Sequence, residues 1–299
     1  MFPADTSDLR HAYSRVSLAL LAYTAVTSFL SNLYAIPYYQ GNYDLYFNDW
    51  YYYLGSPAIV YGVGLLLLPL ILRNCPTPKI ARAPRPRFRQ VGSGLLCGLG
   101  ALYAGSYLGQ LLLFHTNTSD YAGEAMSGTP IFFALLCTVI IAPILEEIIF
   151  RKLLLDRLLF LGDWSALLIS ALFFALFHTN LYQFFYAFTV GVILGYIRIM
   201  TGSLAWNIGL HMFINFFCGV MVDYLPDWPW VWGVMGVLAI SSMLYCALYL
   251  YTEQPWRNLY PGPLYWFDGK GKCFACLTSF PFWLCVVTHL GLSVYYIIP

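Results

Sequence analysis

Two adjacent carboxylates, Glu146 and Glu147, lie in the apolar stretch ILEEIIF of a 299-residue chain that has only 14 Asp and Glu residues. An ionisable group inside a membrane-spanning segment is costly and is functional by default. Glu147 and Arg151 are four residues apart, with the acid on the N-terminal side, which is the favourable order for an ion pair on one helix face. Glu146 is turned about 100° away and has no basic partner in its own helix. The spacing therefore predicts a supporting ion pair at Glu147 and an available carboxylate at Glu146.

Two histidines occur in similar apolar surroundings. His178 follows Phe174 by four residues, and His211 precedes Asn215 by four, so each pair shares a helix face. An imidazole and an amide side by side can donate two hydrogen bonds to one point, as an oxyanion hole requires. A carboxylate without an ion-pair partner suits a general base that takes a proton from water. The set predicts chemistry that uses water, without selecting peptide hydrolysis among such reactions.

The helices that carry these groups must place them at one level. A turn near Gly162–Asp163 separates Glu146 from His178, and each lies about 16 residues from it, or roughly 24 Å along an antiparallel helical hairpin. His211 lies about eight residues, or roughly 12 Å, into a later helix. These levels agree if the hairpin projects about 10 Å from the membrane. The hairpin then joins the following helix at Asn180, below the outer surface.

The composition identifies the environment. Hydrophobic residues make up 60% of the chain and charged residues 10%, whereas soluble domains carry roughly 25% charged residues. We therefore expect an all-α, polytopic integral membrane protein in a lipid bilayer. The formal net charge of +1 gives no indication of a nucleic-acid partner.

About nine apolar segments are candidates for membrane-spanning helices. They are 14–36, 52–73, 92–114, 130–160, 164–179, 182–200, 203–222, 229–252 and 277–298. With the N-terminus inside, all 15 Lys and Arg residues fall in or next to cytoplasmic segments, including the basic segment 76–90. The positive-inside rule therefore favours nine spans, with the N-terminus inside and the C-terminus outside.

We divide the chain into three parts. Residues 1–129 form an N-terminal three-helix membrane segment with a basic cytoplasmic loop, 130–222 form the core that carries the chemistry, and 223–299 form a C-terminal two-helix membrane segment.

The motifs resemble those of a known family. Glu146-Glu147-x-x-x-Arg151, Phe174-x-x-x-His178 and His211-x-x-x-Asn215 are similar, in order and in their placement on three helices, to the motifs of the CPBP family. That family includes the type II CAAX prenyl proteases and bacteriocin-processing and self-immunity proteins of the ABI type. The resemblance covers about 130–222, and the flanking spans show none.

The resemblance implies an intramembrane glutamate-type endopeptidase. Glu146 would activate water, His178 would bind or polarise that water, and His211 and Asn215 would stabilise the oxyanion. Glu147 and Arg151 would form the supporting ion pair. Its substrate would be a membrane-associated peptide or protein, either prenylated and CAAX-like or a leader, pheromone or bacteriocin peptide.

A zinc metalloprotease is the alternative within the same family. Glu146, His178 and His211 could ligate zinc and leave one position open, as catalytic sites do. The HExxH helix of zinc peptidases is missing from the sequence, and the nearby Arg151 disfavours a dication. We therefore favour a site with no metal and no other cofactor.

Two alternatives from other functional classes remain open. A proton- or cation-coupled transporter could use the same ionisable groups, although the polar residues gather at one level and no inverted repeat is evident. A non-catalytic immunity or scaffold protein could retain the motifs. The compact loops favour a bacterial plasma membrane as the location.

Overall fold

The structure is a computed structural model that describes residues 6–75, 88–113, 128–225, 228–260 and 278–295. All regular secondary structure in these ranges is helical, which confirms the all-α prediction. Most of the basic segment 76–90 lies outside the described residues.

Eight α-helices and three π-helical stretches carry most of the fold. The longer α-helices are α1 (Thr6–Tyr34), α4 (Asp49–Leu72), α5 (Phe88–Leu113), α10 (Asp163–Leu176), α11 (Leu181–Thr201), α12 (Leu204–Ile214), α14 (Pro229–Glu253) and α16 (Phe280–Tyr295). The short ones are α2 (Ile36–Tyr39), α3 (Tyr43–Tyr46), α7 (Ile131–Phe133), α8 (Ala142–Glu146), α9 (Asp156–Leu158) and α13 (Met221–Tyr224). The π-helical stretches are η1 (Ala134–Ile141), η2 (Glu147–Leu155) and η4 (Asn215–Val220), and the 3₁₀ turns are η3 (Leu159–Leu161) and η5 (Pro255–Asn258).

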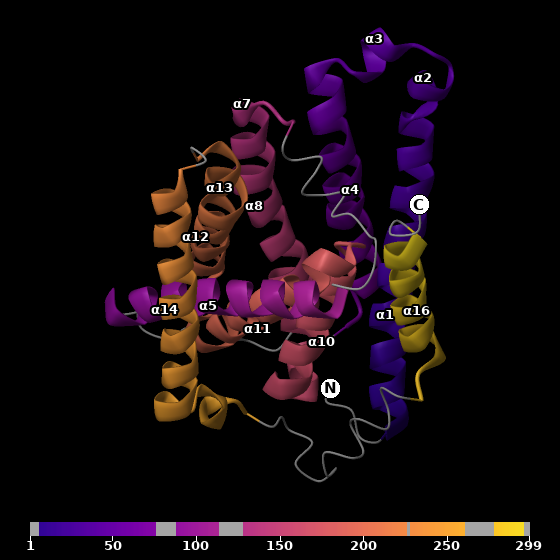
Figure 1. The fold of residues 1–299 in the computed structure, drawn as a ribbon. Coiled ribbons are helices and arrows are strands. Elements are labelled where there is room, and N and C mark those ends of the chain that lie inside the picture. The colour runs from indigo at the N-terminus through magenta and orange to yellow at the C-terminus, as the bar shows by residue number, and fades with distance from the viewer. Residues whose placement is uncertain (1–5, 76–87, 114–127, 226–227, 261–277, 296–299) are drawn as a thin grey trace.

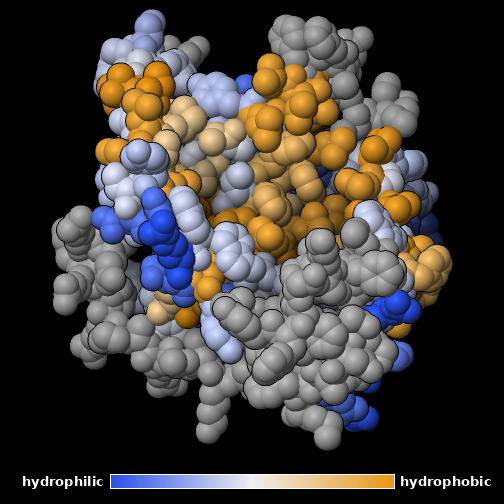
Figure 2. Space-filling view, turned by 90° about the horizontal axis from the view of Figure 1, so that it is seen from below, coloured by the Kyte–Doolittle hydropathy of each residue, from blue (hydrophilic) through white to orange (hydrophobic). Residues whose placement is uncertain are grey.

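The lengths and surfaces of these helices suit a bilayer. In the part of the chain that the structure describes, six helical segments are long and apolar enough to cross a membrane, and three further apolar helices are shorter: Asp163–Leu176, Leu204–Val220 and Phe280–Tyr295. On α14 the exposed side chains include Val237, Leu244 and Leu248, each at least 60% exposed. Large apolar patches of this kind are rare on soluble monomers. Figure 2 shows hydrophobic side chains over much of the described surface seen from below. The prediction of a polytopic membrane bundle is therefore confirmed, whereas nine crossings and their orientation stay a prediction.

The central helices lie between two flanking groups (Figure 1). On one side α1 packs against α4 and α16, and on the other α14 packs against α5. Between them α11 packs against both α5 and α10. The helix from α7 to α9, which carries Glu146, contacts α4, α10 and α12. This arrangement brings side chains from the first half of the chain against the central motifs.

Several segments predicted to face the cytoplasm meet at one end of the molecule. Arg157 Nε donates to the Leu72 carbonyl at 3.2 Å, and Arg198 forms a bidentate pair with Asp156 at 2.6 and 3.1 Å. The Tyr260 N–H donates to Asp163 at 2.8 Å. In Figure 1 the start of α1 and the end of α14 lie low, whereas α2, α3, α7 and α13 lie toward the top. The links tie together the helix ends after α4, α9, α11 and α14.

Two irregularities occur beside the predicted site. Pro143, which has no N–H to donate, lies at the start of α8, between the π-helical stretches η1 and η2. Such wide turns inside α-helices often occur at functional sites. At the other position, α10 ends at Leu176 and α11 begins after Asn180, which is 1% exposed and whose side chain accepts from the Tyr182 N–H. The two helices therefore join inside the protein, and the turn holds His178 there.

Candidate active site

A cavity of about 550 Å³ lies among α4, α5, α8, α10, α11 and α12. Its polar lining includes Glu146, His178, His211 and Asn215, together with Tyr61 and Thr138. Apolar side chains, among them Phe174 and Ile214, make up much of the remaining wall. Four of the residues that the sequence singles out thus share one cavity, and they come from two helices and the turn after α10.

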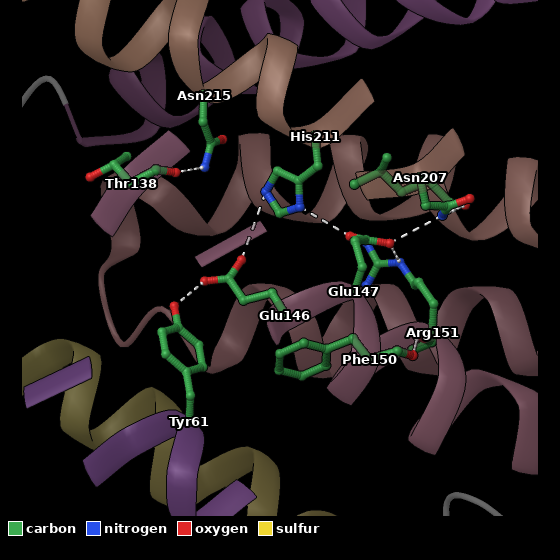
Figure 3. A network of polar contacts seen from close by, with 11 residues as sticks. Tyr61, Thr138, Glu146, Glu147, Phe150, Arg151, Asn207, His211 and Asn215 are labelled. Atoms are coloured by element: carbon green, nitrogen blue, oxygen red, sulfur yellow. Dashed lines mark hydrogen bonds and ion pairs between the residues drawn. The ribbon is translucent and has the colours of Figure 1, made fainter. Parts of the chain in front are cut away.

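Glu146 divides its two carboxylate oxygens between neighbours on different helices. Oε1 accepts a hydrogen bond from the Tyr61 hydroxyl at 2.7 Å, and Oε2 lies 3.7 Å from His211 Nε2 (Figure 3). The side chain is 16% exposed. Glu146 is therefore held in place and is still open to the cavity.

Glu147, one residue further, is fully buried and engaged on all sides. Its Oε2 lies 3.3 Å from Arg151 Nε and accepts from Asn207 Nδ2 at 3.1 Å, while its Oε1 lies 3.0 Å from His211 Nδ1. Arg151 is also fully buried, and its guanidinium carbon stands 4.5 Å from the centre of the Phe174 ring. The expected contact between Glu147 and Arg151 is present, and Glu147 also contacts His211 and Asn207.

His211 lies between the two carboxylates (Figure 3). Because an ionised carboxylate can accept but not donate a hydrogen bond, His211 Nδ1 carries a proton that it donates to Glu147. The other nitrogen, Nε2, faces Glu146. A buried carboxylate that orients an imidazole in this way is a common device of hydrolytic sites. Glu147 thus fixes the ring whose free edge meets Glu146.

His178 is fixed by its own helix. Its Nδ1 donates to the Phe174 carbonyl at 2.8 Å, and its ring meets the Phe174 ring edge-on at 4.9 Å between centroids. With the Nδ1 proton in that bond, Nε2 of the neutral ring carries a lone pair. His178 therefore presents a hydrogen-bond acceptor in a cavity-lining residue.

Asn215 and His211 come from the same helix but contact different partners. Asn215 Nδ2 donates to the Thr138 carbonyl on η1 at 2.9 Å, whereas His211 contacts Glu146 on α8 and Glu147 on η2. The Asn215 amide group has two hydrogens, so this bond leaves one for another acceptor. The close-up shows both side chains directed toward the helix that carries Glu146 (Figure 3).

The nitrogen that each histidine leaves free decides how it could hold a metal. Within the described residues, no group of three or more His, Cys, Asp or Glu side chains is placed to hold a metal ion. His211 Nδ1 is occupied by Glu147, and His178 Nδ1 by a carbonyl. A metal ion would therefore be held through the two Nε2 atoms and Glu146, and the site without a metal stays a prediction.

Sequence reasoning missed three residues that contact the motifs. Tyr61 binds Glu146, Asn207 binds Glu147 and the Leu194 carbonyl, and Thr138 binds Asn215 through its main chain. Asn207 lies four residues before His211, so the two residues share a helix face, and this spacing in the sequence could have identified Asn207. Tyr61 and Thr138 come from other segments, and no spacing rule connects them to the site.

Comparison with known proteins supports the resemblance. Residues 128–217 match the family model described as Rce1-like, type II CAAX prenyl endopeptidase Rce1-like. This match confirms the similarity to the CPBP family and supports a protease of the intramembrane CAAX type. No curated protein and no solved structure matches the chain. The match contains Glu146, Glu147, Arg151, His178, His211 and Asn215, and it excludes Tyr61.

Proposed function

We propose that the protein is an intramembrane endopeptidase in which Glu146 activates a water molecule without a metal ion. One observation carries the proposal: Glu146 lines a cavity within an apolar bundle, with Oε2 3.7 Å from His211 Nε2 and with His178 and Asn215 in the same lining. The family match supports peptide hydrolysis over the other reactions that use water.

The first step of the proposed reaction is attack by water. Glu146 Oε2 takes one proton while the water oxygen bonds to the carbonyl carbon of the scissile peptide. The His178 Nε2 lone pair can accept the second hydrogen of that water and so orient it. This assignment is supported by the Nδ1 bond of His178 to the Phe174 carbonyl, which leaves Nε2 available as an acceptor.

The second step needs stabilisation of the oxyanion and a proton for the leaving amine. The second Asn215 hydrogen is a suitable donor to the oxyanion. Donation from His211 Nε2 requires a proton on that nitrogen in addition to the Nδ1 proton that bonds Glu147. Glu146 then returns its proton to the amine nitrogen as the C–N bond breaks, which restores the starting carboxylate.

The substrate class that we propose is a membrane-associated peptide, with a prenylated CAAX-like C-terminus favoured by the description of the matched family. A leader, pheromone or bacteriocin peptide would also have to place its scissile peptide bond in the cavity of the apolar bundle. The bacterial plasma membrane is proposed as its location.

The test uses the full chain in proteoliposomes with a prenylated CAAX peptide, and mass spectrometry of the products. We expect wild-type protein to release the C-terminal fragment and Glu146→Gln to lose at least roughly 100-fold in kcat, the lower range of general-base effects. Glu253→Gln, at the end of α14 and exposed, is the matched control and should retain activity. Equal product from wild-type and Glu146→Gln protein would refute the proposal, and solute flux that depends on Glu146 would favour a transporter instead.

A further inference from the structure

Tyr61 touches the proposed base from a part of the chain that lies outside the family match. It belongs to α4, whereas the match covers 128–217. Its hydroxyl donates to Glu146 Oε1 at 2.7 Å, and Tyr61 also lines the cavity. We propose that Tyr61 is a positioning residue that holds the Glu146 carboxylate so that Oε2 is the atom that takes the proton from water. This inference rests on the proposed function.

The first step of the argument is the geometry of the carboxylate. Glu146 ends α8 at the boundary with the π-helical stretch η2, and it has no ion-pair partner on its own helix. The two oxygens of a free glutamate exchange by rotation, since the terminal torsion is broad and two-fold. The bond from Tyr61 distinguishes them: Oε1 is occupied, and Oε2 faces His211 Nε2. One oxygen is therefore anchored and the other is presented to the reaction.

The second step is how α4 comes close enough. Gly64 lies three residues after Tyr61, on the same face of α4. A Cβ at Gly64 would stand 2.7 Å from Ile149 Cδ1, a side chain three residues after Glu146. The two helices therefore pack closely beside Tyr61, whose hydroxyl reaches the carboxylate across this contact.

The third step is chemical. A phenol hydroxyl is a neutral donor, so it stabilises the carboxylate without the competing charge that a Lys or Arg would bring. In apolar surroundings a carboxylate that lacks its hydrogen bonds is costly. Tyr61 thus supplies a bond that keeps Glu146 in a defined rotamer and leaves it free to accept a proton.

The test compares Tyr61→Phe with wild-type protein in the peptide assay described above. Misplacement of a reacting group by about 1 Å can cost about 100-fold, so we expect a fall in kcat of roughly 10- to 100-fold with KM within about twofold. The matched control is Tyr245→Phe, which removes a hydroxyl bonded at 2.7 Å to Ser93 between α5 and α14, away from the cavity. It should keep the wild-type kcat.

Each outcome has a separate meaning. Activity in wild-type protein, loss in Glu146→Gln and a wild-type kcat in Tyr61→Phe would overturn the role of Tyr61 and leave the proposed function intact. No Glu146-dependent activity in the wild type would overturn the proposed function itself. A rise in KM with unchanged kcat would also overturn the positioning role, because it indicates lost substrate binding.

A second pair of variants covers the case in which Tyr61→Phe does not fold, as judged by circular dichroism in detergent. Gly64→Ala places a Cβ 2.7 Å from Ile149 Cδ1 and so forces a shift beside Glu146, whereas a Cβ at Gly62 meets no atom within 4 Å. We expect Gly64→Ala to lower kcat with KM unchanged and Gly62→Ala to leave both unchanged. Equal kcat values in the two variants would overturn the inference.

Discussion

Glu146 and Glu147 are adjacent in sequence, yet their surroundings differ in almost every respect. Glu147 is fully buried with three polar partners, whereas Glu146 opens to the cavity and has a phenol and an imidazole beside it. The difference arises because successive residues of a helix point in directions about 100° apart. One carboxylate therefore stabilises the bundle while its neighbour meets the cavity.

The same Glu-to-Gln substitution should lower the stability of the protein at Glu147 but not at Glu146. Glu147→Gln removes the charge that compensates Arg151 in a fully buried pair, and loss of one partner of such a pair costs about 3–5 kcal/mol. We expect a large fall in the unfolding temperature in detergent. Glu146→Gln should retain the wild-type unfolding temperature within a few degrees, because Arg151 keeps its contact with Glu147. An equally stable Glu147→Gln protein would contradict the structural role of the pair.

Asn207 should contribute to the stability of the protein through its hydrogen bonds to two other helices. Its amide donates to Leu194 at 2.6 Å and to Glu147 at 3.1 Å, and the side chain is fully buried. In Asn207→Ala the buried Glu147 carboxylate loses this donor, and a hydrogen bond to a charged group contributes about 1.5–3 kcal/mol. Denaturation in detergent should show that loss. A variant as stable as the wild type would show that a water replaces the amide.

At the scale of the elements, close helix packing shapes the cavity. A Cβ at Gly105 of α5 would lie 2.5 Å from Tyr186 Cα and 2.7 Å from the Phe185 carbonyl oxygen of α11. Neither atom can move without shifting α11, whose Tyr186 and Val190 line the cavity. The distance between α5 and α11 therefore depends on Gly105, which lies outside every motif in the sequence.

Gly105→Ala should lower both stability and activity. Overpacking of this kind typically costs about 1–3 kcal/mol, and the shift of α11 should reduce kcat. The matched control is Gly94→Ala on the same helix, where the new Cβ would meet Ile197 Cδ1 at an ordinary 3.5 Å. That control should be neutral, or more stable by up to about 1 kcal/mol because alanine favours helix. Identical unfolding temperatures for the two variants would contradict this account of the packing.

At the scale of the whole molecule, the charges and the donor set lead to two further expectations. The helix ends that carry Arg157, Arg198 and Tyr260 are linked to one another, and the sequence assigns them all to the cytoplasm. In the interior, His211 lies between the carboxylates of Glu146 and Glu147.

The positive-inside distribution predicts the topology. A fluorescent protein fused before Met1 should fluoresce, and alkaline phosphatase fused after Pro299 should be active, because the N-terminus is expected inside and the C-terminus outside. The exchanged fusions serve as controls and should be inactive. Fluorescence at both ends would contradict the count of nine crossings.

Metal removal should leave activity unchanged. Peptide cleavage should stay within about twofold after incubation with EDTA or 1,10-phenanthroline, whereas a catalytic zinc site loses its metal to a strong chelator. Wild-type protein treated with chelator and then with zinc provides the control. Loss of activity that zinc restores would show that Glu146, His178 and His211 do gather around a metal.

The sequence by itself determined the fold class, the approximate helix boundaries and the family resemblance. The expected segments 52–73, 182–200 and 229–252 correspond to Asp49–Leu72, Leu181–Thr201 and Pro229–Glu253. Local rules suffice here, because apolar length and the spacing of residues on one helix depend on neighbours in the chain. The same spacing linked Glu147 to Arg151 and His211 to Asn215.

The tertiary structure decided which of these groups meet and through which atoms. Three contacts depend on how distant helices pack. His211 bridges both carboxylates, Asn215 contacts Thr138, and Tyr61 anchors Glu146. Tyr61 and Glu146 are 85 residues apart, and no periodicity within either helix relates them. The contact depends on how closely α4 packs against the helix of Glu146, a property that belongs to the packed pair and not to either sequence alone.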